Sequence, residues 1–280
     1  MAADPRRVAV AAGATLAVAA SAVGVLVAEG FHARRQAGVR NTAAPYSDGR
    51  YGPRGGTSYR LAVLGDSSAA GLGADGRDST VGALLATGLS NLTDRAVVLA
   101  TMAVVGAQSR DLAPQVERAL QIRPHVVVIM IGANDVTHLR GTRRPVAELC
   151  KQITRLREAG VEVVLATCPD LGSVRLFPQP LREVAGRMSD SMARAQAEGA
   201  REAGARVVPL AALLGQDFTS WPDVFFSRDR FHPSDDGYAA AAAAILPSVL
   251  MALGEPELLS RLGADESAAE SGAAGLPSAS

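Results

Sequence analysis

The stretch that decides the fold is 59-YRLAVLGDSSAAGLG-73, a mainly apolar run that ends in a turn of small residues. Residues 60–64 are short, apolar and bounded by turn residues, which predicts a buried β-strand. Gly65 lets the chain turn sharply without a clash at Cβ. Ser67 then lies just past the carboxyl end of the strand. Parallel α/β sheets bind their ligands at that edge, so Ser67 is a candidate functional residue.

Two later stretches carry polar residues that complement this serine. The stretch 132-GAND-135 also follows an apolar run, and 229-DRFHP-233 lies near the end of the same pattern of strands and helices. Serine, then glycine and asparagine, then Asp-x-x-His supply a nucleophile, donors for an oxyanion, a base and a group that orients the base. Together these residue types indicate acyl-transfer chemistry, which none of the stretches indicates alone.

Strands and helices alternate along most of the chain. Apolar runs predict strands at 60–64, 96–105, 126–131, 161–167 and 206–210. Apolar residues at helical spacing predict helices at 79–92, 110–122, 145–159, 181–203 and 234–253. This order predicts an α/β fold, a three-layer α/β/α sandwich around a central parallel sheet of about five strands. Ser67, Gly106 and Asn134 each follow one of the first three strands, so right-handed crossovers bring them to one edge of the sheet.

The polar motifs resemble those of the SGNH (GDSL-type) hydrolase family. They stand in the family's order and span about 170 residues: Gly65-Asp66-Ser67, Gly106, 132-GAND-135 and 229-DRFHP-233. Ser68 occupies the position where the family's name-giving motif has leucine, which leaves the subfamily open. The resemblance implies the flavodoxin-like fold of this family and a serine hydrolase that acts on ester bonds.

The resemblance also implies the catalytic roles. Ser67 is the nucleophile and His232 is the base that takes its proton. Asp229 stands three residues before His232, where one turn brings its carboxylate to the far ring nitrogen, fixes the tautomer and stabilises the imidazolium. Pro233 restricts the backbone of His232 to extended conformations. The alternative for Asp229 is an ordinary surface charge.

The oxyanion site follows from the same resemblance. The N–H groups of Ser67 and Gly106 and the side-chain amide of Asn134 are the expected donors. A turn that merely ends a strand is the alternative interpretation of Gly106. Asp66 and Asp135 are expected to hold the loops of the site.

Composition excludes several classes of function. The formal net charge is zero, which argues against a nucleic-acid partner bound through its phosphates. Two cysteines and four histidines show neither CxxC nor zinc-type spacing, so we expect no metal, and the chemistry needs no cofactor.

Two other motifs are excluded by their context. The stretch 71-GLGADG-76 fits a dinucleotide-binding motif, but it starts too far past the strand for that role. The G-x-S-x-G motif of α/β-hydrolases is absent from the sequence.

The ends of the chain differ from the middle. Residues 1–36 contain an uncharged apolar run at 8–28, long enough to span a bilayer. We expect a single-pass anchor at the cell membrane with an extracytoplasmic catalytic domain, and thus membrane association. A cleaved signal peptide with secretion and a soluble alanine-rich helix are the alternatives. Residues 37–58 predict a flexible linker. The hydrolase domain is expected at 59–254, followed by a disordered tail at 255–280.

The two cysteines leave a choice open. Cys150 falls on a predicted helix and Cys168 ends the following strand. A disulfide suits an extracytoplasmic domain, and two buried free thiols are the alternative.

Aromatic residues gather just before His232. Four of the six phenylalanines and the only tryptophan lie in 218–231, which predicts an apolar wall suited to an acyl chain. Residues 171–180 are expected to form the opposite lip, although these aromatics could also serve only to pack the loop. Lipid or short-chain acyl esters are the expected substrates. A carbohydrate O-deacetylase, an acyltransferase or a thioesterase is the alternative enzyme, and a membrane-tethered binding domain is the non-enzymatic alternative.

Overall fold

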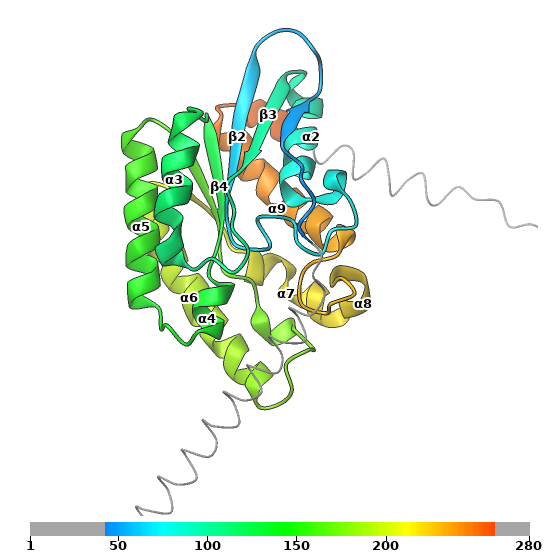
Figure 1. Cartoon of the computed structure of the whole chain (residues 1–280), viewed down its shortest axis with the longest axis vertical. Helices are drawn as coiled ribbons and strands as arrows, with labels where there is room; N and C mark the ends of the chain where they lie inside the picture. Colours follow the sequence, from blue (N-terminus) through cyan, green and yellow to red (C-terminus); the bar gives the residue numbers. More distant parts are fainter. Residues whose placement is uncertain (1–42, 261–280) are drawn as a thin grey trace, which may run out of the picture.

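The computed structural model describes residues 43–260, which form a three-layer α/β/α sandwich around a six-stranded sheet (Figure 1). The strand order is β1-β3-β2-β4-β5-β6. The strands are β1 (Gly49–Tyr51), β2 (Ser58–Gly65), β3 (Ala96–Thr101), β4 (Val126–Met130), β5 (Glu162–Ala166) and β6 (Arg206–Val208). Strands β2 to β6 pair in parallel, as the alternating sequence pattern predicts, whereas β1 is antiparallel to β3.

Strand β1 corrects the expectation of about five strands. It comes from the segment 37–58 that the sequence predicts to be a flexible linker. Gly49 pairs with Leu99 and Tyr51 with Val97, so β1 covers the outer edge of β3. The three residues of β1 show no strand pattern in the sequence. They form a strand because the edge of β3 would otherwise be unpaired. The first part of the expected linker, up to residue 42, lies outside the described residues.

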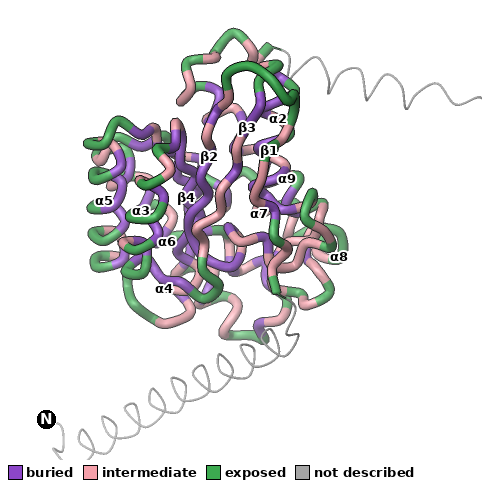
Figure 2. Tube along the Cα trace, turned by 45° about the horizontal axis from the view of Figure 1, so that its top comes forward, coloured by how far each residue is buried: buried purple, intermediate pink, exposed green. Residues whose placement is uncertain are grey.

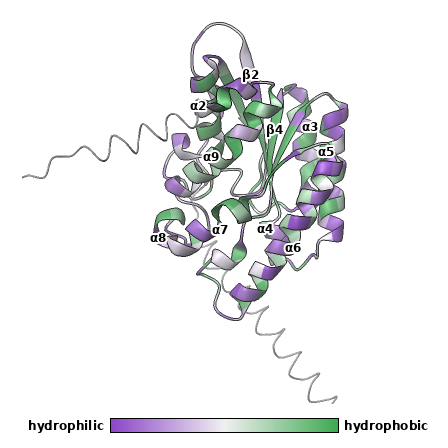
Figure 3. Cartoon of the chain, turned by 180° about the vertical axis from the view of Figure 1, so that it is seen from behind, coloured by the Kyte–Doolittle hydropathy of each residue, from purple (hydrophilic) through white to green (hydrophobic). Residues whose placement is uncertain are grey.

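Helices cover both faces of the sheet. Helices α2 (Val81–Thr93) and α9 (Asp235–Ala252) lie on one face, whereas α3 (Leu112–Gln121), α5 (Arg143–Glu158) and α6 (Leu181–Glu202) lie on the other (Figure 1). Seen from behind, α5 and α6 carry hydrophilic residues away from the sheet, while the central strands are mostly hydrophobic (Figure 3). Covering both faces is what makes the strands continuous apolar runs.

Strand β2 divides its side chains between two cores. Leu61 and Val63 belong to the cluster under α2 and α9, whereas Ala62 and Leu64 belong to the cluster under α3 and α5. This division follows from the two-residue period of a strand. All four side chains are fully buried, and β2 and β4 lie in the buried centre of the molecule (Figure 2).

Shorter helices lie at the carboxyl edge of the sheet and at the end of the domain. They are α4 (Ala133–Thr137), α7 (Leu210–Ser220), α8 (Pro222–Phe225) and the 3₁₀ helices η1 (Arg77–Ser79), η2 (Ser109–Asp111), η3 (Leu171–Ser173) and η4 (Pro256–Leu258). The predicted N-cap of α9 is confirmed, because the Ser234 hydroxyl accepts a hydrogen bond from the Gly237 N–H at 3.1 Å.

The ends of the described chain are partly packed on the domain. Leu258 and Leu259 contact the core and the Tyr59 hydroxyl donates to Glu255, so the start of the expected tail 255–280 is ordered. Residues 261–280 lie outside the described part. The same holds for the predicted anchor at 8–28, and none of the helices within residues 43–260 is long and apolar enough to cross a membrane.

The two thiols are free, as in the second alternative for the cysteines, but only Cys168 is buried, whereas Cys150 is half-buried. Cys150 lies on α5 against Gly199 of α6, whereas Cys168 lies beside Gly132 at the end of β5. Burial raises the pKa of Cys168 well above its ordinary value, which keeps this thiol protonated and unreactive.

Candidate active site

The turn after β2 requires glycine at position 65. Gly65 has φ of 138°, and a Cβ built on it would lie 1.8 Å from the backbone oxygen of Met130 on β4. Only a residue without a side chain can therefore bring β2 this close to β4 before the chain turns. The Asp66 N–H donates to the same oxygen at 3.1 Å. This contact fixes the position of Ser67, which is 7% exposed.

A glutamine from the neighbouring helix also holds this turn. Gln115 on α3 is completely buried. Its side-chain oxygen accepts from the Gly65 N–H at 2.8 Å, and its side-chain nitrogen donates to the Gly65 oxygen at 3.0 Å. The sequence analysis missed this residue. The available signal was an amide side chain beside Val116 on the apolar face of a predicted helix.

Ser67, His232 and Asp229 form a connected chain of hydrogen bonds. The Ser67 Oγ lies 2.9 Å from the His232 Nε2, and the His232 Nδ1 lies 2.6 Å from the Asp229 Oδ2. All three side chains are buried or nearly so. Residues that stand 165 positions apart thus meet at one edge of the sheet. The geometry is that of a nucleophile, a base and a group that orients the base.

The loop before α9 is wound around the Asp229 carboxylate. Its Oδ1 accepts from the N–H groups of Phe231 and His232 at 2.8 and 2.9 Å, and from the Ser227 hydroxyl at 2.8 Å. The alternative of a solvated surface charge does not fit these contacts. One oxygen of Asp229 shapes the loop, and the other contacts the imidazole of His232.

The Asp229 carboxyl group is ionised over the whole pH range in which an esterase works. Burial by itself raises the pKa of this carboxyl group. The hydrogen bond and the charge of His232, with the two backbone N–H donors, outweigh burial and lower the pKa to about 2. An ionised carboxylate at Nδ1 keeps the proton there and leaves Nε2 free to accept the proton of Ser67.

The three expected oxyanion donors each retain an N–H without an acceptor in the described part of the chain. Within residues 43–260, the backbone N–H groups of Ser67 and Gly106 have no acceptor. Gly106 has φ of 82°, a conformation that favours glycine. The Asn134 amide donates one N–H to the Ala107 oxygen at 3.1 Å, which orients the amide and leaves its second N–H for a ligand. The Asn134 side chain on α4 therefore contacts the loop that carries Gly106.

Asp66 and Asp135 hold the surrounding loops, as the sequence predicts. An oxygen of Asp66 accepts from the Ser68 N–H at 3.0 Å. An oxygen of Asp135 accepts from both the N–H and the hydroxyl of Ser109, at 3.0 and 2.8 Å. Burial raises the pKa of Asp66 to about 6 and raises that of Asp135 as well. Both carboxyl groups lie beneath the reacting centre and shape its loops.

Gln196 supports the asparagine loop from below. This fully buried residue of α6 donates from its side-chain nitrogen to the Ile131 oxygen at 2.9 Å and accepts from the Cys168 N–H at 2.7 Å. Gly132 has φ of 129°, and a Cβ there would lie 2.8 Å from the same nitrogen. Glycine at 132 therefore allows the amide to join the ends of β4 and β5. Sequence reasoning missed Gln196, which again shows only as a polar residue on a buried helix face.

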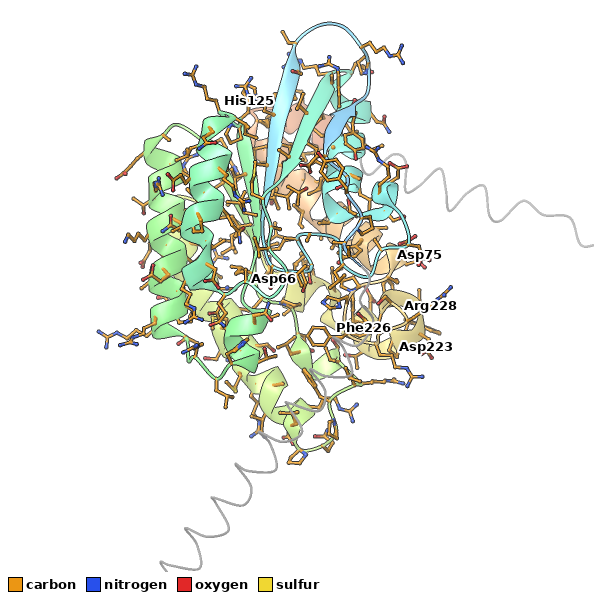
Figure 4. All side chains as sticks on the ribbon, in the orientation of Figure 1. Asp66, Asp75, His125, Asp223, Phe226 and Arg228 are labelled. Carbon is orange, nitrogen blue, oxygen red and sulfur yellow. The ribbon has the colours of Figure 1, made fainter. Side chains whose placement is uncertain are left out.

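An apolar cavity of about 90 Å³ opens next to these residues. Ser68, Ala133, Phe231 and Pro233 line it, and each is adjacent in sequence to a proposed site residue. The remaining lining is mostly apolar and comes from the ends of β2, β4 and β5 and the segments that follow them, from α7, and from the start of α9. Figure 4 shows Asp66 at the foot of β2 and Phe226 below it near α8, both of which border the cavity.

The predicted aromatic wall is present in part. Phe218, Phe226 and Phe231 line the cavity, with Leu171 and Val174 of the predicted opposite lip. The Phe218 and Phe226 rings pack edge to face with their centroids 5.0 Å apart, which fixes the wall. The tryptophan behaves differently, because it is 65% exposed and lies outside the cavity lining.

No metal centre accompanies the site in the part of the chain that the structure describes. Residues 43–260 hold no cluster of three or more His, Cys, Asp or Glu side chains arranged to bind an ion. What the arrangement supplies is a hydroxyl, an imidazole, a carboxylate and three N–H donors. That set can perform nucleophilic acyl transfer.

A parallel α/β/α sandwich with a serine, a histidine and an asparagine at its carboxyl edge defines a class of hydrolases, and comparison with known proteins gives the family. Residues 63–240 match the GDSL-like lipase/acylhydrolase family. The chain belongs to this family. It is also 38% identical over 243 residues to the GDSL-like esterase Rv1075c of Mycobacterium tuberculosis, a match that covers 82% of this chain and 77% of that protein.

Solved structures share the fold at low sequence identity. TesA superposes with a TM-score of 0.57 at 21% identity, covering 69% of this chain and 99% of that chain. A GDSL-like lipase from Parabacteroides merdae gives 0.55 at 20% identity, with coverage of 70% and 96%. A catalytic mutant of Axe2, an acetylxylan esterase from Geobacillus stearothermophilus, gives 0.53 at 21% identity, also with coverage of 70% and 96%. The fold is therefore that of the SGNH hydrolases, and the chain is a hydrolase that acts on esters.

Proposed function

We propose that this esterase uses Ser67 as a nucleophile and proceeds through an acyl-enzyme intermediate. The observation that carries the proposal is the unbroken contact from Ser67 through His232 to Asp229, at 2.9 and 2.6 Å. A serine hydroxyl attacks an ester only when a base removes its proton. The imidazole Nε2 of His232 is within reach of that proton.

The reaction then runs in two halves. The Ser67 Oγ bonds to the ester carbonyl carbon while its proton passes to the His232 Nε2, and the carbonyl oxygen becomes an oxyanion. Donors on Ser67, Gly106 and Asn134 bind this charge. The oxyanion collapses, the bond to the alcohol breaks, and His232 returns the proton to the departing oxygen. Water then gives a proton to the His232 Nε2 and attacks the acyl carbon, the bond between that carbon and the Ser67 Oγ breaks, and His232 returns the proton to Ser67 as the carboxylic acid leaves.

We propose an apolar acyl group as the part of the substrate that the protein recognises. The cavity beside Ser68, Ala133 and Phe231 supports this, because its surface is mostly carbon and it adjoins the reacting centre. Its volume of about 90 Å³ and its apolar lining suit a short acyl chain better than a sugar ring. Short-chain acyl esters and lipids with an accessible acyl chain are therefore the proposed substrates.

The experiment compares the full chain with Ser67→Ala and His232→Ala on soluble p-nitrophenyl acetate, butyrate and octanoate. We expect the parent to hydrolyse these esters and both variants to lose about 10⁴-fold or more in kcat, since removing either member of such a pair has that effect in serine proteases. Ser68→Ala is the matched control, because it removes the neighbouring hydroxyl. Equal turnover by the parent and Ser67→Ala would exclude the proposed nucleophile.

A further inference from the structure

Exposed large apolar side chains gather at one end of the domain. Residues 43–260 contain eight of them, and six lie on segments at the carboxyl edge of the sheet, where the proposed active site opens. We name these six the apolar rim: Tyr46, Val104, Val105, Leu139, Trp221 and Val224. Single exposed apolar residues are ordinary on soluble proteins. Several exposed apolar residues gathered at one end of a domain indicate an interaction surface.

One side of the rim adjoins the proposed oxyanion donors. Val104 and Val105 immediately precede Gly106, and their side chains are 47% and 55% exposed. The loop that carries Leu139 is attached to the same region, because the Arg140 guanidinium donates to the Gln108 side chain at 3.1 Å. These apolar side chains therefore point to solvent beside the donors.

The other side of the rim adjoins the proposed base. Trp221 and Val224 lie at the junction of α7 and α8. The Ser234 hydroxyl donates to the Val224 oxygen at 2.5 Å, and Phe226 pairs with Pro233, the residue after His232. One part of the rim thus adjoins the proposed oxyanion donors, and the other adjoins the proposed base.

Leu139 stands out within the rim. It has φ of 54°, in the left-handed region that favours glycine or asparagine, and it is 61% exposed. Neither packing nor backbone preference explains a leucine at this position. An exposed leucine in this backbone conformation is explained if a partner outside the chain covers its side chain.

The described chain also enters the domain at this edge. Strand β1 runs antiparallel to β3, and Asp48 accepts from the Thr101 N–H at the carboxyl end of β3 at 2.8 Å. Tyr46 and the described residues before it, 43–45, therefore lie on the side of the active site. The apolar run 8–28 is separated from them only by 29–42, a stretch that spans about 50 Å at most when fully extended.

Two arginines lie beside the Leu139 part of the rim, whereas an exposed acid, Asp223, precedes Val224 in the other part. Arg143 and Arg144 begin α5 close to Leu139, and both are exposed. Neither forms an ion pair within residues 43–260. Guanidinium groups beside exposed apolar side chains suit the anionic headgroups and the acyl boundary of a membrane.

We propose that the apolar rim docks on a lipid surface, so that the active site opens toward the membrane. The same membrane would hold the run at 8–28. Tryptophan and aliphatic side chains enter the boundary between headgroups and acyl chains, and arginines stay among the headgroups. The proposal goes beyond the esterase chemistry and does not depend on it, because docking needs neither Ser67 nor His232. It places the acyl cavity next to a source of acyl chains.

The chain provides its own probe for this surface. Trp221 is its only tryptophan, so its fluorescence reports on the rim alone. The full chain is reconstituted with vesicles of phosphatidylcholine and phosphatidylglycerol, with and without brominated acyl chains. We expect the Trp221 emission to shift to the blue in vesicles, to be quenched by the brominated lipids and to become shielded from the aqueous quencher acrylamide.

A matched control moves the probe to the opposite end. Met251 is exposed near the end of α9, beside the start of β6. In the double variant Trp221→Phe with Met251→Trp, we expect no quenching by brominated lipids, although the run at 8–28 is unchanged. This separates docking of the rim from anchoring of the chain.

One further variant tests the docking, and one further assay tests the esterase function. Leu139→Asn removes an apolar side chain and suits the left-handed backbone, so we expect weaker quenching of Trp221 without loss of folding. Hydrolysis of soluble p-nitrophenyl acetate on the same samples tests the esterase function separately. A Trp221 that brominated lipids do not quench, or that they quench no more than a tryptophan at 251, would overturn the docking proposal.

Discussion

At the scale of single residues, the proposed site depends on side chains that contact more than one neighbour. Asp229 is the clearest example. One of its oxygens accepts from the N–H groups of Phe231 and His232, and the other contacts the His232 ring. The sequence predicts the second contact from the three-residue spacing. It does not predict the first, because a backbone N–H carries no residue-specific signal.

Replacing this carboxylate tests the role of the tautomer. Asp229→Asn keeps an oxygen for the loop, but it presents no negative charge to the His232 Nδ1. We expect kcat for a soluble ester to fall by about 10⁴-fold, as the equivalent change does in serine proteases, because the histidine adopts the wrong tautomer. Steady-state kinetics and circular dichroism measure activity and folding.

An exposed acid nearby supplies the control for that change. Asp223 on α8 lies at the surface (Figure 4). Asp223→Asn removes the same charge and is expected to leave kcat unchanged. If Asp229→Asn retained parental kcat, His232 would need no carboxylate to orient it.

At the scale of elements, buried glutamines connect the helices to the ends of the strands. Gln115 of α3 pairs with both backbone groups of Gly65, and Gln196 of α6 joins the loops that follow β4 and β5. Sequence patterns place these residues on helices correctly. They do not predict that a side-chain amide will hydrogen-bond to backbone groups at the end of a strand, because that depends on how the helix packs on the sheet.

Gln115→Leu tests this connection. It leaves the N–H of Gly65 buried without a partner, at a cost of about 1–3 kcal/mol, whereas the Gly65 oxygen keeps the hydrogen bond from the Val104 N–H at 3.1 Å. We therefore expect a clear drop in the free energy of unfolding, and a lower kcat because the Ser67 turn loosens. Urea unfolding and kinetics on p-nitrophenyl acetate report the two effects.

The matched substitution on the same helix is Gln121→Leu. Gln121 is exposed at the end of α3, so we expect little change in stability or activity. Equal stability of the two variants would show that the pairing with Gly65 contributes nothing.

At the scale of the whole molecule, the acyl cavity is assembled from segments far apart in the chain. The loops after β2, β4 and β5, together with α7, the loop before α9, and α9 itself, supply its walls. No single segment encloses a volume. The aromatic stretch 218–231 predicts a wall, but only the packing of α7 and α9 on the sheet closes the space.

Two adjacent leucines on α7 test whether acyl chains occupy this cavity. Leu214 lines it, whereas Leu213 is 52% exposed. We expect Leu214→Trp to lower kcat/KM for p-nitrophenyl octanoate and butyrate much more than for acetate, because the indole fills the cavity. Leu213→Trp should keep the parental ratio among the three esters. A Leu214→Trp variant with the same chain-length profile as the parent would place the acyl chain elsewhere.

The sequence by itself determined the alternation of strands and helices, the parallel sheet and the set of residues at its carboxyl edge. These follow from local rules: apolar periodicity, turn residues after strands and the handedness of crossovers. The tertiary structure alone decided that β1 covers the edge of β3, that both cysteines stay free, and that Gln115 and Gln196 support the site. Each of these depends on which distant segment comes close enough to contact a given group, and local sequence holds no information on that distance.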